Sequence, residues 1–173
     1  LLYLDLHLTL LKQSYNLFRT NMLPGWAKTK EMINKDPRRQ PYKSFPRMGT
    51  LPKDWAHFKG HYVHDGKAIF SYSVGEGSVL DMPGIVKQKG LTVLTRTVQV
   101  ENPTSSIMLL AENDDSKIEK TDKTFTVSLE GRACNFSLVD FSKGVKLFVW
   151  ENLLLCEVPK GCLLYTSDAA DEW

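Results

Sequence analysis

The sequence predicts an all-β protein whose antiparallel strands form a meander that packs as a sandwich or a partial barrel. Three observations favour this fold class. Asp65-Gly66 separates two β-type segments, turn-forming residues recur about every ten residues, and no stretch keeps a convincing helical period for three turns. The same strand spacing fits part of a β-propeller. That alternative stays open, because no repeat of fixed period is strong enough to select it.

The segment from Leu51 to Pro83 is predicted to form a β-hairpin about Asp65-Gly66. Asp-Gly is a preferred pair in a type I′ turn, because both central positions of that turn need a positive φ. One side of the second arm is apolar and consists of Ala68, Phe70, Tyr72 and Val74. Gly75-Glu76-Gly77 then turns the chain into a third strand, whose pairing is expected to end at Pro83-Gly84.

Two segments precede the hairpin. Residues 1–20 begin with leucine at every second position, so we predict an atypical edge strand or a truncated or divergent segment. Residues 21–53 form a Pro-rich basic connector with five prolines, a density that excludes a regular element. The connector lacks the helix, zinc site or aromatic signature of a nucleic-acid-binding segment. We therefore interpret it as a solvated linker and expect no nucleic-acid partner.

The antiparallel β domain is predicted to span residues 54–160. Residues 91–100 are dense in β-branched side chains and residues 107–112 are apolar, so both read as strands. Residues 113–123 are charged without an apolar period, which predicts a loop. Further strands are predicted at residues 124–129, 134–138, 145–150 and 153–158, where apolar and polar residues alternate or apolar residues run together.

Composition excludes several protein classes. The chain has 173 residues, of which 42% are hydrophobic and 24% charged, as in an ordinary globular domain. The apolar run at residues 1–11 contains Asp5 and His7 and falls short of the ~20 residues that span a bilayer, so we expect no membrane partner. The chain begins without a methionine or a basic leader, and we interpret it as a fragment of a longer protein.

The C-terminal residues 161–173 are predicted to be a non-native tail. From Cys162 the β pattern gives way to CLLYTSDAADE, which resembles the translation of a sequencing adaptor joined to an insert. Two other cysteines remain, Cys134 and Cys156, and their spacing fits neither a zinc ribbon nor covalent haem attachment. We predict that both are buried free thiols, with a disulfide as the open alternative.

Three histidines, His57, His61 and His64, are the only clustered residues of the metal-ligating type. In a regular strand the spacing of four places His57 and His61 on the same face, whereas His64 points elsewhere. Zinc needs three or four converging ligands, and no nearby cysteine or carboxylate clearly completes this set. We therefore predict no metal site.

Four carboxylates are candidates for the acid pair of a glycosidase, namely Asp54, Asp65, Glu76 and Asp81. Such a pair is defined by separation in space, and turn or surface positions are the simpler interpretation. There is no nucleophile-elbow motif, and Gly75-Glu76-Gly77 lacks the third glycine and the helix of a dinucleotide site. We predict no catalytic and no cofactor-binding residue in this chain.

An aromatic platform for sugar is the strongest functional alternative among the side chains. Its candidate members are Trp26, Trp55, Tyr62, Tyr72 and Trp150. Such residues more often pack in the core or at strand ends. Asn135-Phe136-Ser137 also fits a glycosylation acceptor, although in the middle of a predicted strand.

Several motifs together resemble a known but functionally uncharacterised β-rich domain. They are LPGWAK (23–28), DPR (36–38), LPKDWAHFKGHYVHDGKAIFSYSVGEGSVLDMPGI (51–85) and LTRT (94–97). The domain occurs in large secreted proteins of the PVC-type haem-binding kind, some of which carry c-type cytochrome and sorbosone-dehydrogenase-like modules. The resemblance covers residues 22–112, and residues 1–20 depart from it. The framework positions that match are Trp55, Gly60, Tyr62, Gly66, Tyr72 and Gly75.

The resemblance implies an extracytoplasmic protein, periplasmic or secreted, with the other domains of its parent chain as partners. No catalytic role is carried over. The C-x-x-C-H motif is absent, so haem is expected only elsewhere in the parent protein. We hypothesise a non-catalytic structural or binding β module linked to redox or carbohydrate metabolism, with glycan as a candidate ligand. The alternative is a segment of a carbohydrate-processing enzyme whose active site is completed by missing flanks.

Overall fold

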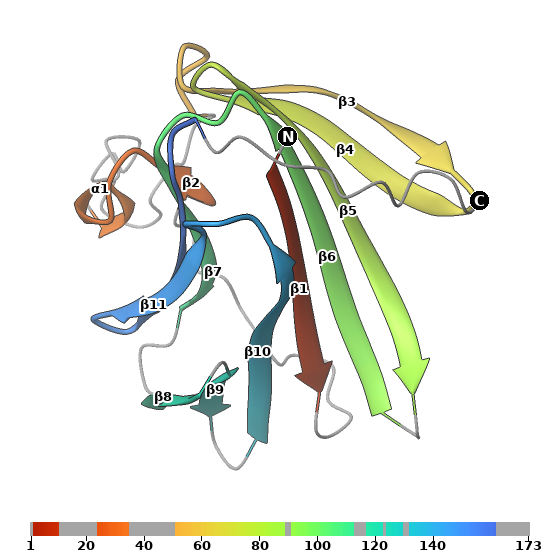
Figure 1. Ribbon diagram of the computed structural model, residues 1–173, viewed down its shortest axis with the longest axis vertical. Coiled ribbons are helices and arrows are strands. Elements are labelled where there is room, and N and C mark those ends of the chain that lie inside the picture. Colours follow the sequence, from red (N-terminus) through yellow and green to blue (C-terminus); the bar gives the residue numbers. More distant parts are fainter. Residues whose placement is uncertain are drawn as a thin grey trace, which may run out of the picture.

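The computed structural model describes residues 2–10, 24–34, 51–88, 91–112, 117–122, 124–129 and 132–161. Most of this part consists of antiparallel strands in two sheets that do not close into a barrel (Figure 1). The larger sheet has the order β3-β4-β5-β6-β1-β10-β9-β8, and the smaller has the order β11-β12-β7-β2. The predicted all-β fold class is confirmed.

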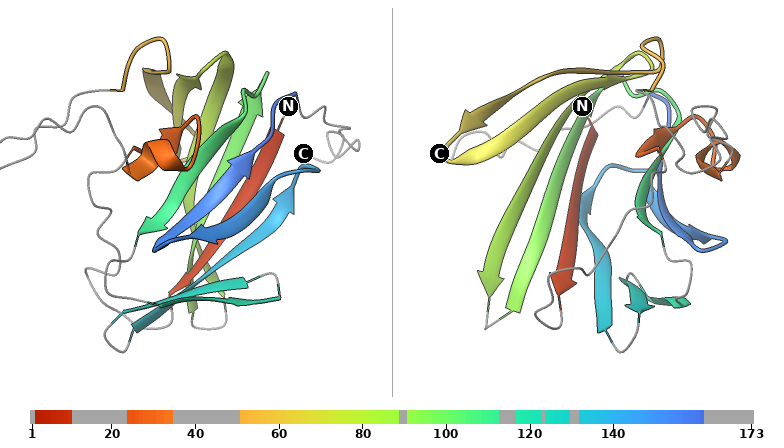
Figure 2. Two further views of the ribbon diagram at one scale, coloured as in Figure 1. Left: turned by 90° about the vertical axis from the view of Figure 1, so that its left-hand side faces the viewer. Right: turned by 180° about the vertical axis from the view of Figure 1, so that it is seen from behind.

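The elements have the following bounds. The larger sheet contains β1 (Leu2–Leu10), β3 (Ala56–His64), β4 (Lys67–Val74), β5 (Gly77–Gln88), β6 (Leu91–Glu101), β8 (Lys117–Thr121), β9 (Thr124–Leu129) and β10 (Arg132–Phe141). The smaller sheet contains β2 (Trp26–Ala27), β7 (Ser106–Glu112), β11 (Lys146–Trp150) and β12 (Leu153–Val158). A short helix, α1 (Glu31–Asn34), lies beside β2. Figure 2 shows the smaller sheet against one face of the curved larger sheet.

The predicted hairpin is present. β3 and β4 pair with His64 opposite Lys67, which leaves Asp65 and Gly66 as a two-residue turn with φ of 48° and 70°. Both angles are positive, as a type I′ turn requires. Gly75, with φ of 57°, begins the next two-residue turn and leads into β5. The local turn chemistry of the sequence therefore accounts for the β3-β4-β5 meander.

Pro83 has a different effect from the one predicted. The pairing of β4 with β5 does end near this proline, with Phe70 opposite Asp81. However, β5 continues through Pro83 to Gln88 and stays paired with β6. Proline lacks an N–H, so it is tolerated on the side of β5 that no longer has a neighbouring strand.

Three local predictions are wrong. β1 lies between β6 and β10 and not at a sheet edge. The basic connector contains β2 and α1, because apolar residues flanked by its prolines pack on the smaller sheet. The predicted charged loop contains β8, whose Ile118 is half-buried against the core. An edge strand can be mostly charged, since only one of its faces meets the core. Residues 35–50 of the connector and 162–173 of the tail lie outside the described residues.

The core lies between the two sheets. Its fully buried members come from both, and the largest are Phe136, Ile33, Met108, Leu153, Leu154, Leu155, Val79, Val98, Val127 and Val158. Phe125, Val127 and Phe136 point inward as the alternation predicts. Cys134 and Cys156 are buried free thiols, which confirms that prediction.

The outer half of the β3–β4 hairpin extends beyond the smaller sheet (Figure 1). Val74 is buried at the base of the hairpin, whereas Phe70 is 38% exposed and Val63 is 69% exposed nearer its tip. The apolar side predicted for β4 therefore meets the core only over its inner part. No described helix is long and apolar enough to cross a membrane.

Candidate functional site

Two tryptophans from the N-terminal third of the chain meet where the two sheets come together. Trp26 belongs to β2 of the smaller sheet, and Trp55 directly precedes β3 of the larger one. The indole Nε1–H of Trp55 donates to the backbone oxygen of Trp26 at 3.3 Å. Trp26 in turn donates from Nε1 to the hydroxyl of Tyr72 at 3.2 Å, and the two rings meet edge to face. These bonds connect the two sheets through polar contacts as well as apolar packing.

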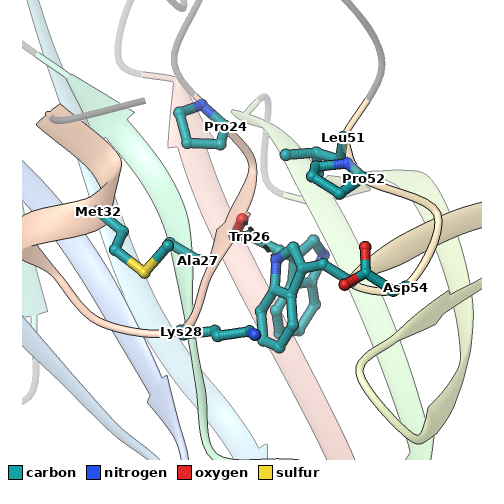
Figure 3. Close-up of a pocket in the computed structure, with 9 residues that line it drawn as sticks. Pro24, Trp26, Ala27, Lys28, Met32, Leu51, Pro52 and Asp54 are labelled. Carbon is teal, nitrogen blue, oxygen red and sulfur yellow. Dashed lines mark hydrogen bonds between the residues drawn. The ribbon is translucent and has the colours of Figure 1, made fainter. Parts of the chain in front are cut away.

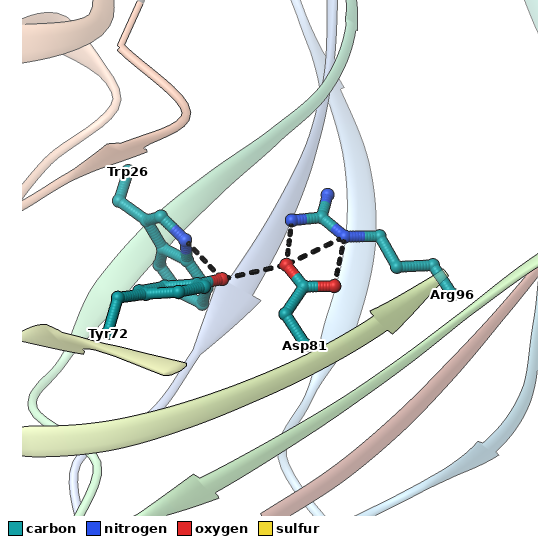
Figure 4. Close-up of polar contacts among 4 residues, drawn as sticks. All are labelled: Trp26, Tyr72, Asp81 and Arg96. Carbon is teal, nitrogen blue, oxygen red and sulfur yellow. Dashed lines mark hydrogen bonds and ion pairs between the residues drawn. The ribbon is translucent and has the colours of Figure 1, made fainter. Parts of the chain in front are cut away.

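Tyr72 begins a polar network on the inner face of the larger sheet (Figure 4). Its hydroxyl donates to Asp81 Oδ2 at 2.9 Å, and Arg96 donates to the same carboxylate through Nε and Nη2. The three residues come from the neighbouring strands β4, β5 and β6. Asp81 is only 6% exposed, so the ion pair is largely desolvated on the carboxylate side. The network therefore joins three strands to Trp26 of the other sheet.

The electrostatics of the network hold Tyr72 and Arg96 in their ordinary neutral-pH charge states. Burial, and then the negative charge of Asp81, raise the pKa of Tyr72, so its hydroxyl stays protonated. Burial acts to lower the pKa of Arg96, but hydrogen bonds to Asp81 and the charge of Asp81 outweigh it and raise that pKa. Neither group is prepared to exchange a proton near neutral pH. The arrangement suits structural support better than acid–base chemistry.

A small pocket lies beside the two tryptophans (Figure 3). Its volume is about 110 Å³, and its walls come from β2, α1 and the turn before β3. The lining residues are Pro24, Trp26, Ala27, Lys28, Met32, Leu51, Pro52, Asp54 and Trp55. The walls are mostly apolar, while Lys28 and Asp54 bring an ammonium and a carboxylate to the rim. The Lys28 ammonium lies 5.3 Å from the centre of the Trp55 ring.

The three histidines do not converge. A β-bulge at Lys59-Gly60 inserts an extra residue into β3, so His57 lies opposite Ser73 and His61 lies opposite Phe70. Ser73 and Phe70 are on opposite faces of β4. The prediction that His57 and His61 share a face is therefore wrong, and His64 shares a face with His57 instead. Among the described residues no group of three metal-ligating side chains is present.

The four candidate carboxylates are dispersed. Asp65 is in the hairpin turn, exposed Glu76 is in the next turn, and Asp54 is at the pocket rim. Only Asp81 is buried, and its partner Arg96 was not identified as a site residue from the sequence. An arginine in the middle of a β-branched strand that is otherwise predicted to be largely buried is the signal that could have identified it.

The proposed aromatic platform is not assembled by the described residues. Trp26 is 6% exposed and Trp55 is 7% exposed, and both belong to the core. Tyr62 is on the exposed hairpin, while half-buried Trp150 is on β11 and has Lys30 over its ring. Core packing is therefore the correct interpretation of the two tryptophans. Asn135, the glycosylation candidate, is half-buried and accepts a hydrogen bond from Thr126 at 2.9 Å.

The two buried cysteines are also unsuited to chemistry. Burial raises the pKa of Cys134 to about 12 and that of Cys156 to about 12. The thiolate is the nucleophilic form of cysteine, so almost none of either residue is reactive at neutral pH. Both side chains act as small apolar residues in the core.

Comparison with known proteins yields one match. Residues 10–81 match a family described as a domain of unknown function (DUF6797). This segment covers less than half of the chain, and it includes every residue that lines the pocket as well as Tyr72 and Asp81. Arg96 lies beyond it. No curated protein and no solved structure matches the chain.

Proposed function

We propose that the chain is a non-catalytic structural or binding β module of a larger extracytoplasmic protein linked to redox or carbohydrate metabolism. The network of Trp26, Tyr72, Asp81 and Arg96 carries the non-catalytic part of this proposal. The polar groups of these four residues form hydrogen bonds with one another, and these bonds link the two sheets. A catalytic acid or base instead needs a pKa near the working pH and access to substrate.

The binding part of the proposal is supported by the pocket beside Trp55. Concave apolar sites with a few polar groups at the rim are the usual form of small-ligand sites. The pocket and most of the network come from residues 10–81, the segment that matches a domain of unknown function. Members of that family are therefore the natural proteins in which to repeat each test.

The setting within a larger protein rests on the sequence motifs alone. LPGWAK, the hairpin segment and LTRT resemble the uncharacterised domain of large secreted haem-binding proteins. The partners are then the other domains of the parent chain, with glycan as a candidate ligand and haem bound elsewhere in that chain. The intact reading frame tests this directly. A signal peptide upstream and a C-x-x-C-H motif downstream support the setting, and the absence of both refutes it.

The distinction between module and enzyme can be tested on the purified protein. We expect no hydrolysis of polysaccharides or aryl glycosides and no reduction of a redox dye. Asp81→Asn should lower stability, and Asp54→Asn serves as its exposed control. The proposal would be overturned if the unsubstituted protein shows turnover and a folded Asp81→Asn or Asp54→Asn variant loses it. That result would favour the carbohydrate-processing enzyme.

A further inference from the structure

We propose that the pocket between Trp26, Trp55 and Met32 binds a compact apolar ring, and that Lys28 and Asp54 at the rim receive the polar group of the ligand. This inference rests on the binding part of the proposed function and assigns to this pocket a ligand class other than glycan. It concerns a small molecule that carries a phenyl-like ring.

The size and walls of the pocket support a single ring. Its volume is about 110 Å³, and apart from the two tryptophans the walls are prolines, alanine, leucine and methionine. An apolar cavity of about 150 Å³ in another protein stays dry and binds benzene. A pocket of the present size therefore suits one ring.

The hydrogen-bonding capacity of the tryptophans is already used. Trp55 Nε1–H donates to the Trp26 backbone oxygen, and Trp26 Nε1–H donates to Tyr72. Indole nitrogen is a donor only, so neither side chain has a further hydrogen bond to offer. The part of a ligand that meets these walls must be apolar, because a buried hydroxyl there would lose its hydrogen bonds to water.

The same geometry disfavours a sugar ring. Sugars stack on broad, exposed indole faces, whereas these two tryptophans are only 6% and 7% exposed. The Lys28 ammonium already lies over the Trp55 ring at 5.3 Å. A pyranose would also bring hydroxyl groups on its whole circumference against walls that cannot pair with them.

The rim supplies charges of both signs. Lys28 and Asp54 are exposed and form no ion pair with another described residue. Figure 3 places them on opposite sides of the indole rings. A ligand anion can thus meet Lys28, and a ligand cation can meet Asp54, while the ring stays in the pocket. Rim charges contribute modestly because water screens them.

The test uses three compounds with the same ring and different polar groups: benzyl alcohol, phenylacetate and benzylamine. Each is titrated into ¹⁵N-labelled protein while the indole N–H signals are recorded. We expect saturable shifts at Trp26 and Trp55 with a Kd of about 1 mM, as a ligand of this size allows. Lys28→Gln should weaken phenylacetate about two- to fivefold, and Asp54→Asn should do the same for benzylamine.

Two tryptophan substitutions provide matched controls. Met32→Trp places an indole at the pocket wall, on a side chain that is 40% exposed, and should abolish the shifts. Val63→Trp places the same group on the exposed hairpin and should leave them unchanged. The inference is overturned if no compound gives saturable shifts, if the two variants bind equally, or if glucose binds more tightly than benzyl alcohol. A failure of the proposed function would be observed as enzymatic turnover. The outcomes above are changes in ligand binding only, so the two failures are distinguishable.

Discussion

Asp81→Asn is the substitution whose effect follows most directly from the structure. Asparagine keeps the shape of the side chain but removes the charge that balances Arg96 and weakens the acceptor of the Tyr72 hydroxyl. Removing one partner of a fully buried ion pair costs about 3–5 kcal/mol. The Arg96 side chain is 34% exposed, so water offsets part of that loss. We expect the free energy of unfolding to fall by about 2–3 kcal/mol.

Urea unfolding followed by circular dichroism at pH 7 measures this loss, provided that the m-value is unchanged. Asp54→Asn is the matched control at an exposed carboxylate and should change stability by less than about 0.5 kcal/mol. The double variant Asp81→Leu with Arg96→Met replaces the pair by apolar groups and should be more stable than Asp81→Leu alone. A loss below about 1 kcal/mol for Asp81→Asn would refute the buried ion pair.

Three further predictions concern single sites. Gly66→Ala should cost about 1 kcal/mol of stability because the φ of Gly66 is 70°. Gly75→Ala should cost at least about 2 kcal/mol, because the added Cβ would also lie only 2.7 Å from Thr104 Oγ1. Equal losses of stability in thermal unfolding would contradict this order. The raised pKa of Tyr72 means that the unfolded chain loses the phenolic proton first, so stability present below about pH 10 is lost above it. The stability of the unsubstituted protein toward urea should therefore fall more steeply above about pH 10 than that of the Tyr72→Phe variant. Parallel curves for the two proteins would contradict this prediction. In a Cys162→Ser variant, Cys134 and Cys156 should react with a thiol reagent at pH 8 only after the protein unfolds. Rapid reaction in the folded protein would disprove the burial of these two thiols.

The sequence predicts the fold where local chemistry decides it. Asp65-Gly66 specifies a two-residue turn, because its backbone angles are accessible to that dipeptide at little cost. Alternation assigns Phe125 and Phe136 to the core, because the side-chain period of a strand is two residues. Both features depend on residues close together in the chain, and both are confirmed.

Prediction fails where one inserted residue or a distant strand decides the outcome. The bulge at Lys59-Gly60 reverses the face of every following residue in β3, so His61 no longer lies with His57. Nothing in the local alternation reveals such an insertion. The charged strand β8 was missed because a single inward side chain, Ile118, is too weak a periodic signal.

The candidate site shows the same division. Trp26, Trp55 and Tyr72 were identified from the sequence as candidate members of an aromatic platform, and Asp81 was identified separately as a candidate for an acid pair. Their actual relation depends on β2 of one sheet meeting β4 and β5 of the other, with a separation of 46 residues between Trp26 and Tyr72. Arg96 completes the network from a third strand.

By itself, the sequence determined the strand class, the turns and the side of most strands that faces the core, because these follow from torsional preferences and a two-residue period. The tertiary structure alone decided which strands are neighbours, where β1 inserts, and that a carboxylate, a guanidinium and a phenol share one desolvated site. Such pairings depend on the free energy of burying groups distant in the chain, which no local pattern encodes.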